Sequence, residues 1–261
     1  MVSERKCKEI EIIREAKKKR IIKFKEAVTL KNFDYVRRQI IESVITKEEI
    51  NKSAIIQEVV TKGPEHLKIV EYLVGQGANI NLPNPNHSNL TPINKVALFG
   101  SLFANQRDTL EKLINMGADI NIPDCDLKTP LMNCIVETRS EDSIEFLIEK
   151  GSNLSATDFE ALTALHYASV YDFPRIVSKI LQLDFDHSNA KAKDNYGMTP
   201  MLYAIECECE VVIKEILTFD ESKIDLNVEN IDADNAIELA LAKKDQRRNP
   251  RLVKMILYHN L

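Results

Sequence analysis

The chain has 261 residues, of which 44% are hydrophobic and 29% are charged, a composition that excludes a disordered chain and allows a sizeable core. No apolar stretch reaches the roughly 18 residues of a membrane-spanning helix, and charges occupy the N-terminus where a signal peptide would be apolar. Five cysteines without framework spacing fit free thiols in a reducing compartment. We therefore expect a cytoplasmic protein, with the nucleus as the other location.

The first predicted element is a basic leader, residues 1–19, with a partly helical pattern. Residues 1–25 carry ten Lys or Arg against four Glu, a net +6, whereas the whole chain is −5 and the remainder is −11. The leader and its border contain four consecutive cations, Lys17, Lys18, Lys19 and Arg20.

Two interpretations of this cationic run remain open. A stack of repeats needs a polar-faced cap at its open end, and this reading is favoured. The alternative is a targeting signal for the nucleus or for an anionic membrane surface. Nucleic-acid binding is disfavoured, because the acidic remainder of the chain would repel phosphate.

Beyond the leader the sequence repeats itself. Similar segments start at Ser53, Thr91, Thr129, Thr163, Thr199 and Asn235, separated by 34 to 38 residues. A Thr hydroxyl can cap a helix, and the Pro that follows Thr91, Thr129 and Thr199 fits a first helical turn. A second, apolar helical pattern follows in each of three copies and stops at a glycine that suits a left-handed helix end: Gly77, Gly117 and Gly151.

These residues resemble the ankyrin repeat family, with DNYGMTPMLYA at 194–204 and TALHYAS at 163–169 as the best copies. The resemblance covers residues 20–261. It implies an all-α ankyrin-repeat solenoid of about seven helix–turn–helix units with short β-hairpin-like fingers. The expected units are 20–48, 49–86, 87–124, 125–158, 159–194, 195–230 and 231–261.

Several copies depart from the repeat pattern. An extra segment, 101–108, must bulge between two helices, and the Pro- and Asn-rich connector 82–90 is expected to be a finger without helix. The finger glycine is kept only as Gly197, because Asn89, Leu127 and Ala161 stand in its place. Asp184 and Asp220 replace helix-ending glycines, so less regular ends are expected there. A last helix should follow the polar loop 243–250.

No residue pattern indicates catalysis. Cys207 and Cys209 lack the second ligand pair that zinc requires, so two free thiols are favoured over a metal or redox site. His166 occupies the repeat's own histidine position and is expected to be structural, since no partner that would orient it for catalysis is evident. His87, in the finger, could contact a ligand. We expect no enzymatic activity, no metal and no cofactor.

In the ankyrin fold, fingers and first helices line a concave groove. Carried over to this chain, the resemblance predicts a set of partner-binding residues: Phe99, Val136, Glu137, Phe159, Glu160, Leu162, Val170, Tyr171, Tyr196, Met198 and Glu206. Exposed aromatic and Met side chains are typical interface anchors, and the three glutamates favour a partner with a basic or apolar segment. The alternative is that individual aromatic residues fill gaps between irregular repeats.

The sequence therefore predicts a non-enzymatic protein-interaction module that acts as an adaptor, inhibitor or assembly scaffold. The alternative is a targeting factor whose basic N-terminal helix directs the chain to the nucleus or to an anionic membrane surface. The abundance of Ile, Lys and Asn suggests an AT-rich genome, so this alternative includes a host-directed protein of a virus, intracellular bacterium or parasite. No residue pattern encodes the partner or the oligomeric state.

Overall fold

A computed structural model describes residues 2–85, 87–100, 105–138, 140–184, 188–219, 225–244 and 250–258. In these ranges the regular elements are helices, and the β-structure consists of one isolated antiparallel bridge between Asn84 and Leu90. The chain divides into two compact units, Met1–Asp119 and Ile120–Leu261, which are described separately below. The first half of the expected insertion at 101–108, and Asp220, lie outside the described residues.

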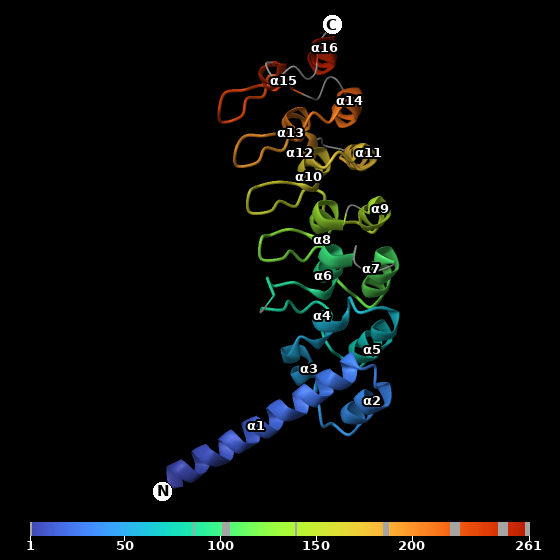
Figure 1. The fold of residues 1–261 in the computed structure, drawn as a ribbon, viewed down its shortest axis with the longest axis vertical. Coiled ribbons are helices and arrows are strands. Elements are labelled where there is room, and N and C mark those ends of the chain that lie inside the picture. Colours follow the sequence, from blue (N-terminus) through green and yellow to red (C-terminus); the bar gives the residue numbers. More distant parts are fainter. Residues whose placement is uncertain are drawn as a thin grey trace. The chain divides into compact units, whose positions relative to one another are not determined.

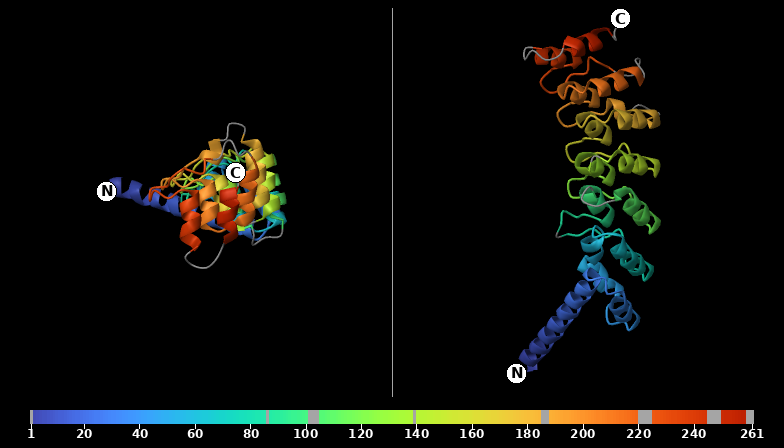
Figure 2. Two further views of the ribbon diagram at one scale, coloured as in Figure 1. Left: turned by 90° about the horizontal axis from the view of Figure 1, so that it is seen from above. Right: turned by 45° about the vertical axis from the view of Figure 1, so that its right-hand side comes forward.

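The described residues of the first unit form seven α-helices (Figure 1): α1 (Val2–Thr29), α2 (Phe33–Ile41), α3 (Lys47–Ser53), α4 (Ile55–Val59), α5 (Pro64–Gly75), α6 (Pro92–Phe99) and α7 (Gln106–Asn115). Within this unit α1 extends away from the other helices (Figure 2). Residues 10–20 are exposed, whereas Phe24, Ala27 and Val28 are buried. The helix continues through residue 19, so the basic leader and the first expected repeat share one helix. No helix of the described ranges is long and apolar enough to cross a membrane.

The second unit contains paired helices, with the loops between pairs on one side (Figures 1 and 2). Its elements are α8 (Pro130–Asn133), the π-helical turn η2 (Cys134–Thr138), α9 (Glu141–Glu149), α10 (Ala164–Val170), α11 (Pro174–Leu183), α12 (Ser188–Lys191), α13 (Pro200–Glu206), α14 (Glu210–Phe219), α15 (Ala236–Lys244) and α16 (Pro250–Tyr258). The core lies between successive pairs, where Leu131, Ile144, Leu165 and Ile176 are fully buried. Each pair thus buries its apolar side against its neighbours.

The predicted helix boundaries are confirmed where the repeat pattern is regular. The hydroxyl oxygen Oγ1 of Thr91, Thr129 and Thr199 accepts a hydrogen bond from the backbone N–H three residues later, at 3.3, 3.4 and 3.3 Å. Gly77 and Gly117 follow the second helices with φ of 91° and 90°, the left-handed conformation that glycine adopts without strain.

The end of α11 differs, as the missing glycine predicts. Asp184 has φ −87°, so it does not adopt the left-handed conformation of Gly77 and Gly117. Its carboxylate accepts hydrogen bonds from the backbone N–H groups of Asn189 and Ala190, at 3.2 and 3.0 Å. The aspartate side chain therefore accepts hydrogen bonds from backbone N–H groups at the start of α12.

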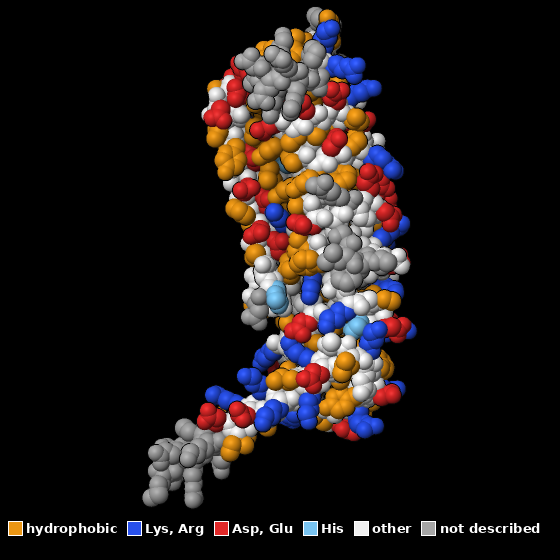
Figure 3. All heavy atoms as spheres, viewed as in Figure 1, with side chains coloured by type: hydrophobic (Ala, Val, Ile, Leu, Met, Phe, Trp, Pro, Cys, Tyr) orange, Lys and Arg blue, Asp and Glu red, His pale blue; other side chains and the backbone are white. Residues whose placement is uncertain are grey.

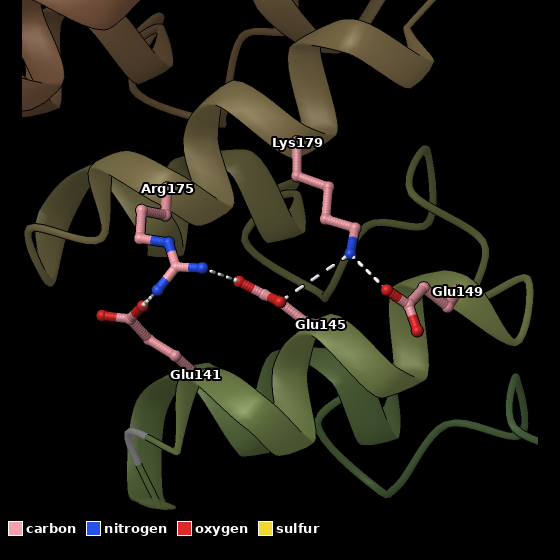
Figure 4. Close-up of polar contacts among 5 residues, drawn as sticks. All are labelled: Glu141, Glu145, Glu149, Arg175 and Lys179. Carbon is pink, nitrogen blue, oxygen red and sulfur yellow. Dashed lines mark hydrogen bonds and ion pairs between the residues drawn. The ribbon is translucent and has the colours of Figure 1, made fainter.

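Ion pairs connect the second helices α9 and α11 (Figure 4). Arg175 lies 3.6 Å from Glu141 and 3.4 Å from Glu145, while Lys179 lies 3.9 Å from Glu145 and 2.6 Å from Glu149. The three glutamates are spaced by four residues and share one face of α9, and so do the two cations on α11. The network bridges the two helices at their surface; Arg175 is 75% exposed, so its contribution to stability is small.

Candidate protein-binding face

The fingers of the second unit begin with an Asp or Asn that builds the turn. The Asp158 Oδ1 atom accepts hydrogen bonds from the N–H groups of Glu160 and Leu162, both at 2.9 Å. The third residue after it, Ala161, has φ 67°. The other three fingers repeat both features, with Asp124, Asp194 and Asn230 as acceptors and Leu127, Gly197 and Ala233 in the left-handed conformation.

The first helices hold three of these fingers in place through the second carboxylate oxygen. The Tyr167 hydroxyl donates to Asp158 Oδ2 at 2.5 Å, and the Tyr203 hydroxyl donates to Asp194 Oδ2 at 2.6 Å. Asn133 makes the corresponding bond to Asp124 at 2.9 Å. Burial and the neighbouring carboxylate both raise the pKa of Tyr167 and of Tyr203, so the two phenols remain protonated donors.

Main-chain hydrogen bonds also join each finger to the next. The Phe159 N–H donates to the Asp126 carbonyl at 3.3 Å, the Asn195 N–H to the Glu160 carbonyl at 3.0 Å, and the Ile231 N–H to the Tyr196 carbonyl at 3.0 Å. The fingertips of residues 124–235 therefore form one continuous row, in which the two inner tips are bonded to a neighbour on both sides and the two outer tips on one side. Such a pre-formed surface loses little conformational entropy on binding.

The row presents apolar side chains to solvent. Phe159, Tyr196 and Ile231 are 60%, 52% and 68% exposed. We call these three residues the fingertip row. Acidic and apolar side chains alternate along this edge of the unit (Figure 3). Exposed acidic residues of the fingers and first helices include Asp126, Glu137, Glu206, Asp232 and Glu238.

The predicted partner-binding residues of the second unit fall into three groups. Exposed members are Glu137, Phe159, Tyr196 and Glu206, and partly exposed members are Val136, Glu160, Val170 and Tyr171. Leu162 and Met198 are only 9% and 6% exposed, so the expectation that they lie on the surface is wrong. Both lie one residue before the capping Thr. At this position the finger returns to the helices, and the side chains of Leu162 and Met198 pack inward.

Two surface features differ from the sequence-based expectation. Ile231 was not among the predicted residues, although it occupies the same place as Phe159, one residue after the Asp or Asn that opens the finger. That shared position was the available signal. Phe99, which is 43% exposed, belongs to the first unit and is part of that unit's surface.

The residues considered above for catalysis or metal binding lie in surroundings that suit a structural role. His166 is fully buried; its Nδ1 accepts from the Thr163 N–H at 3.0 Å, and its Nε2 lies 3.2 Å from the Met198 carbonyl. Cys207 is exposed, while burial raises the pKa of Cys209 to about 12 and so disfavours its thiolate. Within the described ranges, no group of three or more His, Cys, Asp or Glu is placed to hold a metal ion.

The basic leader is partly engaged within its own unit. Lys17, Lys18, Lys19 and Arg20 are exposed on α1. Lys17 nevertheless forms an ion pair with Glu49 at 2.9 Å. A hydrogen bond from the Thr46 backbone, and then the contact with Lys17, lower the pKa of Glu49. At least one of the four cations therefore stabilises the start of α3.

Comparisons with known proteins agree with this architecture. A family model described as ankyrin repeats (3 copies) matches residues 56–158. A protein of Fowlpox virus (strain NVSL), named as an ankyrin repeat protein, is 25% identical over 180 residues, which are 68% of this chain and 51% of the relative. A protein of Acanthamoeba polyphaga mimivirus, also named as an ankyrin repeat protein, is 26% identical over 155 residues, 58% of this chain and 19% of the relative.

The match thus spans about half the length of the first relative and about a fifth of the second. Ankyrin repeats are typically protein–protein interaction modules and are generally not catalytic. The repeat motifs, the helix pairs with their capped starts and the family match lead to one conclusion: this chain contains ankyrin repeats.

Proposed function

We propose that this chain is a non-enzymatic interaction module that binds a partner protein through the fingertip row and the adjoining first helices of residues 120–258. The observation that carries the proposal is the row itself: three large apolar side chains, each at least half exposed, on a backbone fixed by hydrogen bonds. Large exposed side chains on a rigid surface are what an interface uses as anchors.

The charges of this face indicate the chemistry of the partner. Asp126, Glu137, Glu206 and Asp232 are exposed beside the row, and Glu160 is partly exposed. We infer a partner segment that combines apolar residues with Lys or Arg, because opposite charges at the rim steer association and exclude acidic competitors. The chain acts as an adaptor, inhibitor or assembly scaffold by holding this partner in a cytoplasmic or nuclear setting.

The test compares two matched triple variants of the full chain. Phe159→Ala, Tyr196→Ala, Ile231→Ala removes the fingertip row. Leu183→Ala, Val211→Ala, Leu257→Ala removes three exposed apolar side chains from the second helices α11, α14 and α16 instead. Circular dichroism first establishes that both variants are folded.

The readout is affinity capture, together with binding of a labelled Lys- and Leu-containing peptide and its Glu-containing counterpart. We expect the wild type and the second-helix variant to retain the same protein and to bind the Lys-containing peptide more tightly than the Glu-containing one. The fingertip variant should lose both the retained protein and this preference. Equal retention by all three proteins would contradict the proposed face. A preference for the acidic peptide that the fingertip variant loses would contradict the proposed partner chemistry.

A second candidate function is targeting by the basic helix. Lys18, Lys19 and Arg20 are exposed on α1 and make no ion pair with another described residue. We propose that these cations direct the chain to the nucleus or to an anionic membrane surface, and the similarity to two virus-encoded proteins supports a host-directed role. A fluorescent fusion should change its location when the three are replaced by Ala; an unchanged distribution would contradict targeting.

A further inference from the structure

The first unit contains a groove that is separate from the fingertip row. One wall is a face of α1, the floor is the segment 51–58 of α3 and α4, and the other wall is formed by residues 82–85, 87 and 89 of the finger. The groove encloses about 880 Å³. All of its lining residues belong to residues 1–119, so the groove is complete within one unit.

The groove has a cationic lining with an apolar strip. Residues of α1 that line it recur at helical spacing and therefore share a face: Arg14, Lys17, Lys18, Ile21, Ile22 and Lys25. Lys52 adds a fifth cation from α3, and Leu82, Pro83 and Pro85 add apolar surface from the finger. Lys and Arg side chains gather over α1 and the elements beside it (Figure 3).

The positive charge of this lining is only partly compensated. Glu58 is the acidic member among the described lining residues, and it pairs with Lys25 at 2.5 Å. Lys17 pairs with Glu49 at 2.9 Å. Arg14, Lys18 and Lys52 form no ion pair with any residue that the structure describes. Arg14 and Lys18 lie on one face of α1 and Lys52 lies on α3, so the groove holds three uncompensated positive charges that would attract an anionic ligand.

The walls are fixed before any ligand arrives. The buried Gln57 side chain donates a hydrogen bond to the Leu82 carbonyl, and Lys95 donates to the Gln57 carbonyl at 2.6 Å. The Asn84 N–H donates to the Leu90 carbonyl at 3.0 Å, which closes the base of the finger. Ile22 remains 46% exposed between these walls. The groove therefore presents an apolar strip and cationic side chains between walls whose backbone is already held in place, which lowers the entropic cost of binding.

We infer that this groove binds an acidic segment of a partner protein in which Asp or Glu residues alternate with apolar ones. The carboxylates would lie against Arg14, Lys18 and Lys52, and the apolar side chains against Ile21, Ile22 and the prolines. Nucleic acid fits less well, because no Phe, Tyr or Trp side chain for base stacking is among the described lining residues. A flat lipid surface would not reach the floor of a concave site.

Charge substitutions within α1 and α3 provide a matched test in the full chain. The groove variant is Arg14→Ala, Lys18→Ala, Lys52→Ala. The control variant is Lys19→Ala, Arg20→Ala, Lys23→Ala, which removes the same charge from other faces of α1. The probe is a short fluorescein-labelled peptide of Glu with regularly spaced Leu, and binding is followed by fluorescence anisotropy. A Glu-only peptide, oligo(dT) and phosphatidylserine vesicles are the comparison ligands.

We expect the groove variant to bind the Glu–Leu peptide about tenfold more weakly, while the control variant retains wild-type affinity. The wild type should bind the Glu-only peptide more weakly and should lose affinity as salt is raised. Equal losses in both variants would overturn the inference, since binding would then follow net charge alone. Tighter binding of oligo(dT) or vesicles than of the peptide would also overturn it.

A second copy of the chain is the remaining alternative occupant. Sedimentation of the wild type, the groove variant and the control variant decides this point. If the wild type and the control variant associate as concentration rises and the groove variant does not, the groove binds a second copy of the chain and the inferred partner segment is wrong. Loss of the fingertip row leaves Arg14, Lys18 and Lys52 untouched. The two proposals therefore fail separately.

Discussion

The substitution Gly197→Ala tests the stacking of the fingers most directly. Gly197 has φ 71°, and a Cβ added there would lie 3.2 Å from Asn230 Cα and 3.4 Å from the Ile231 nitrogen. These atoms are backbone of the next finger, so they can move only if that finger moves. The Ile231 N–H also donates to the Tyr196 carbonyl. An alanine at 197 would therefore strain the bond that joins the last two fingertips.

The expected cost follows from three contributions. Alanine in the left-handed conformation loses about 1–2 kcal/mol relative to glycine. The smaller entropy of the unfolded alanine chain returns about 0.4–1 kcal/mol. Displacement of the crowded backbone adds about 1 kcal/mol. The free energy of unfolding should consequently fall by about 1–2.5 kcal/mol.

Urea unfolding followed by circular dichroism measures this change, with hydrogen exchange at residues 194–235 to locate it. The control is Ala161→Gly, the same position in another finger, where alanine already occupies φ 67°. Removal of that strain should leave stability within about 1 kcal/mol of wild type, because added chain entropy offsets the gain. If Gly197→Ala is as stable as wild type, the argument from close finger stacking is refuted.

Three further predictions concern single side chains of the second unit. Burial lowers the pKa of His166, and nearby carbonyls and carboxylates raise it by a smaller amount, so the folded state keeps the imidazole neutral. The free energy of unfolding should therefore fall as pH drops below about 6.5, by up to roughly 1.4 kcal/mol per pH unit. Thermal melts between neutral pH and pH 5 should show a shallower fall for His166→Gln, and parallel curves would exclude this origin. Tyr203→Phe removes the 2.6 Å bond to Asp194 and should cost about 1–2 kcal/mol in urea unfolding, whereas no loss would show that water replaces the phenol. Arg175→Ala should cost less than about 1 kcal/mol, since the guanidinium is 75% exposed, and a larger loss would mean that the α9–α11 ion pairs are strongly coupled.

Much of the local structure could be predicted from the sequence. The Thr-Pro pairs at 91, 129 and 199 mark helix starts because the hydroxyl and the proline ring act within one turn. Gly77 and Gly117 mark helix ends for the same local reason. The left-handed residues at Asn89, Leu127 and Ala161 were also foreseeable, because the repeat register places a turn there whatever residue fills it.

The candidate surfaces were only partly predictable. The repeat register identified Phe159 and Tyr196 as exposed, yet it also selected Leu162 and Met198, which pack inward. Whether a finger residue points out or in depends on how the hairpin returns to its helix and on the neighbouring finger. Ile231 shows the opposite error: it is exposed but was not predicted to be, because its exposure also depends on the stacking of the fingers.

The sequence by itself determined the repeat, its helix caps and its all-helical class, because those features depend on side chains within a few residues of each other. Only the tertiary structure decided that α1 runs unbroken through residue 19 and that its cationic face meets the finger at 82–89. That groove joins segments more than fifty residues apart in the sequence. Their meeting depends on the packing of whole helices against one another, which no local spacing of residue types encodes.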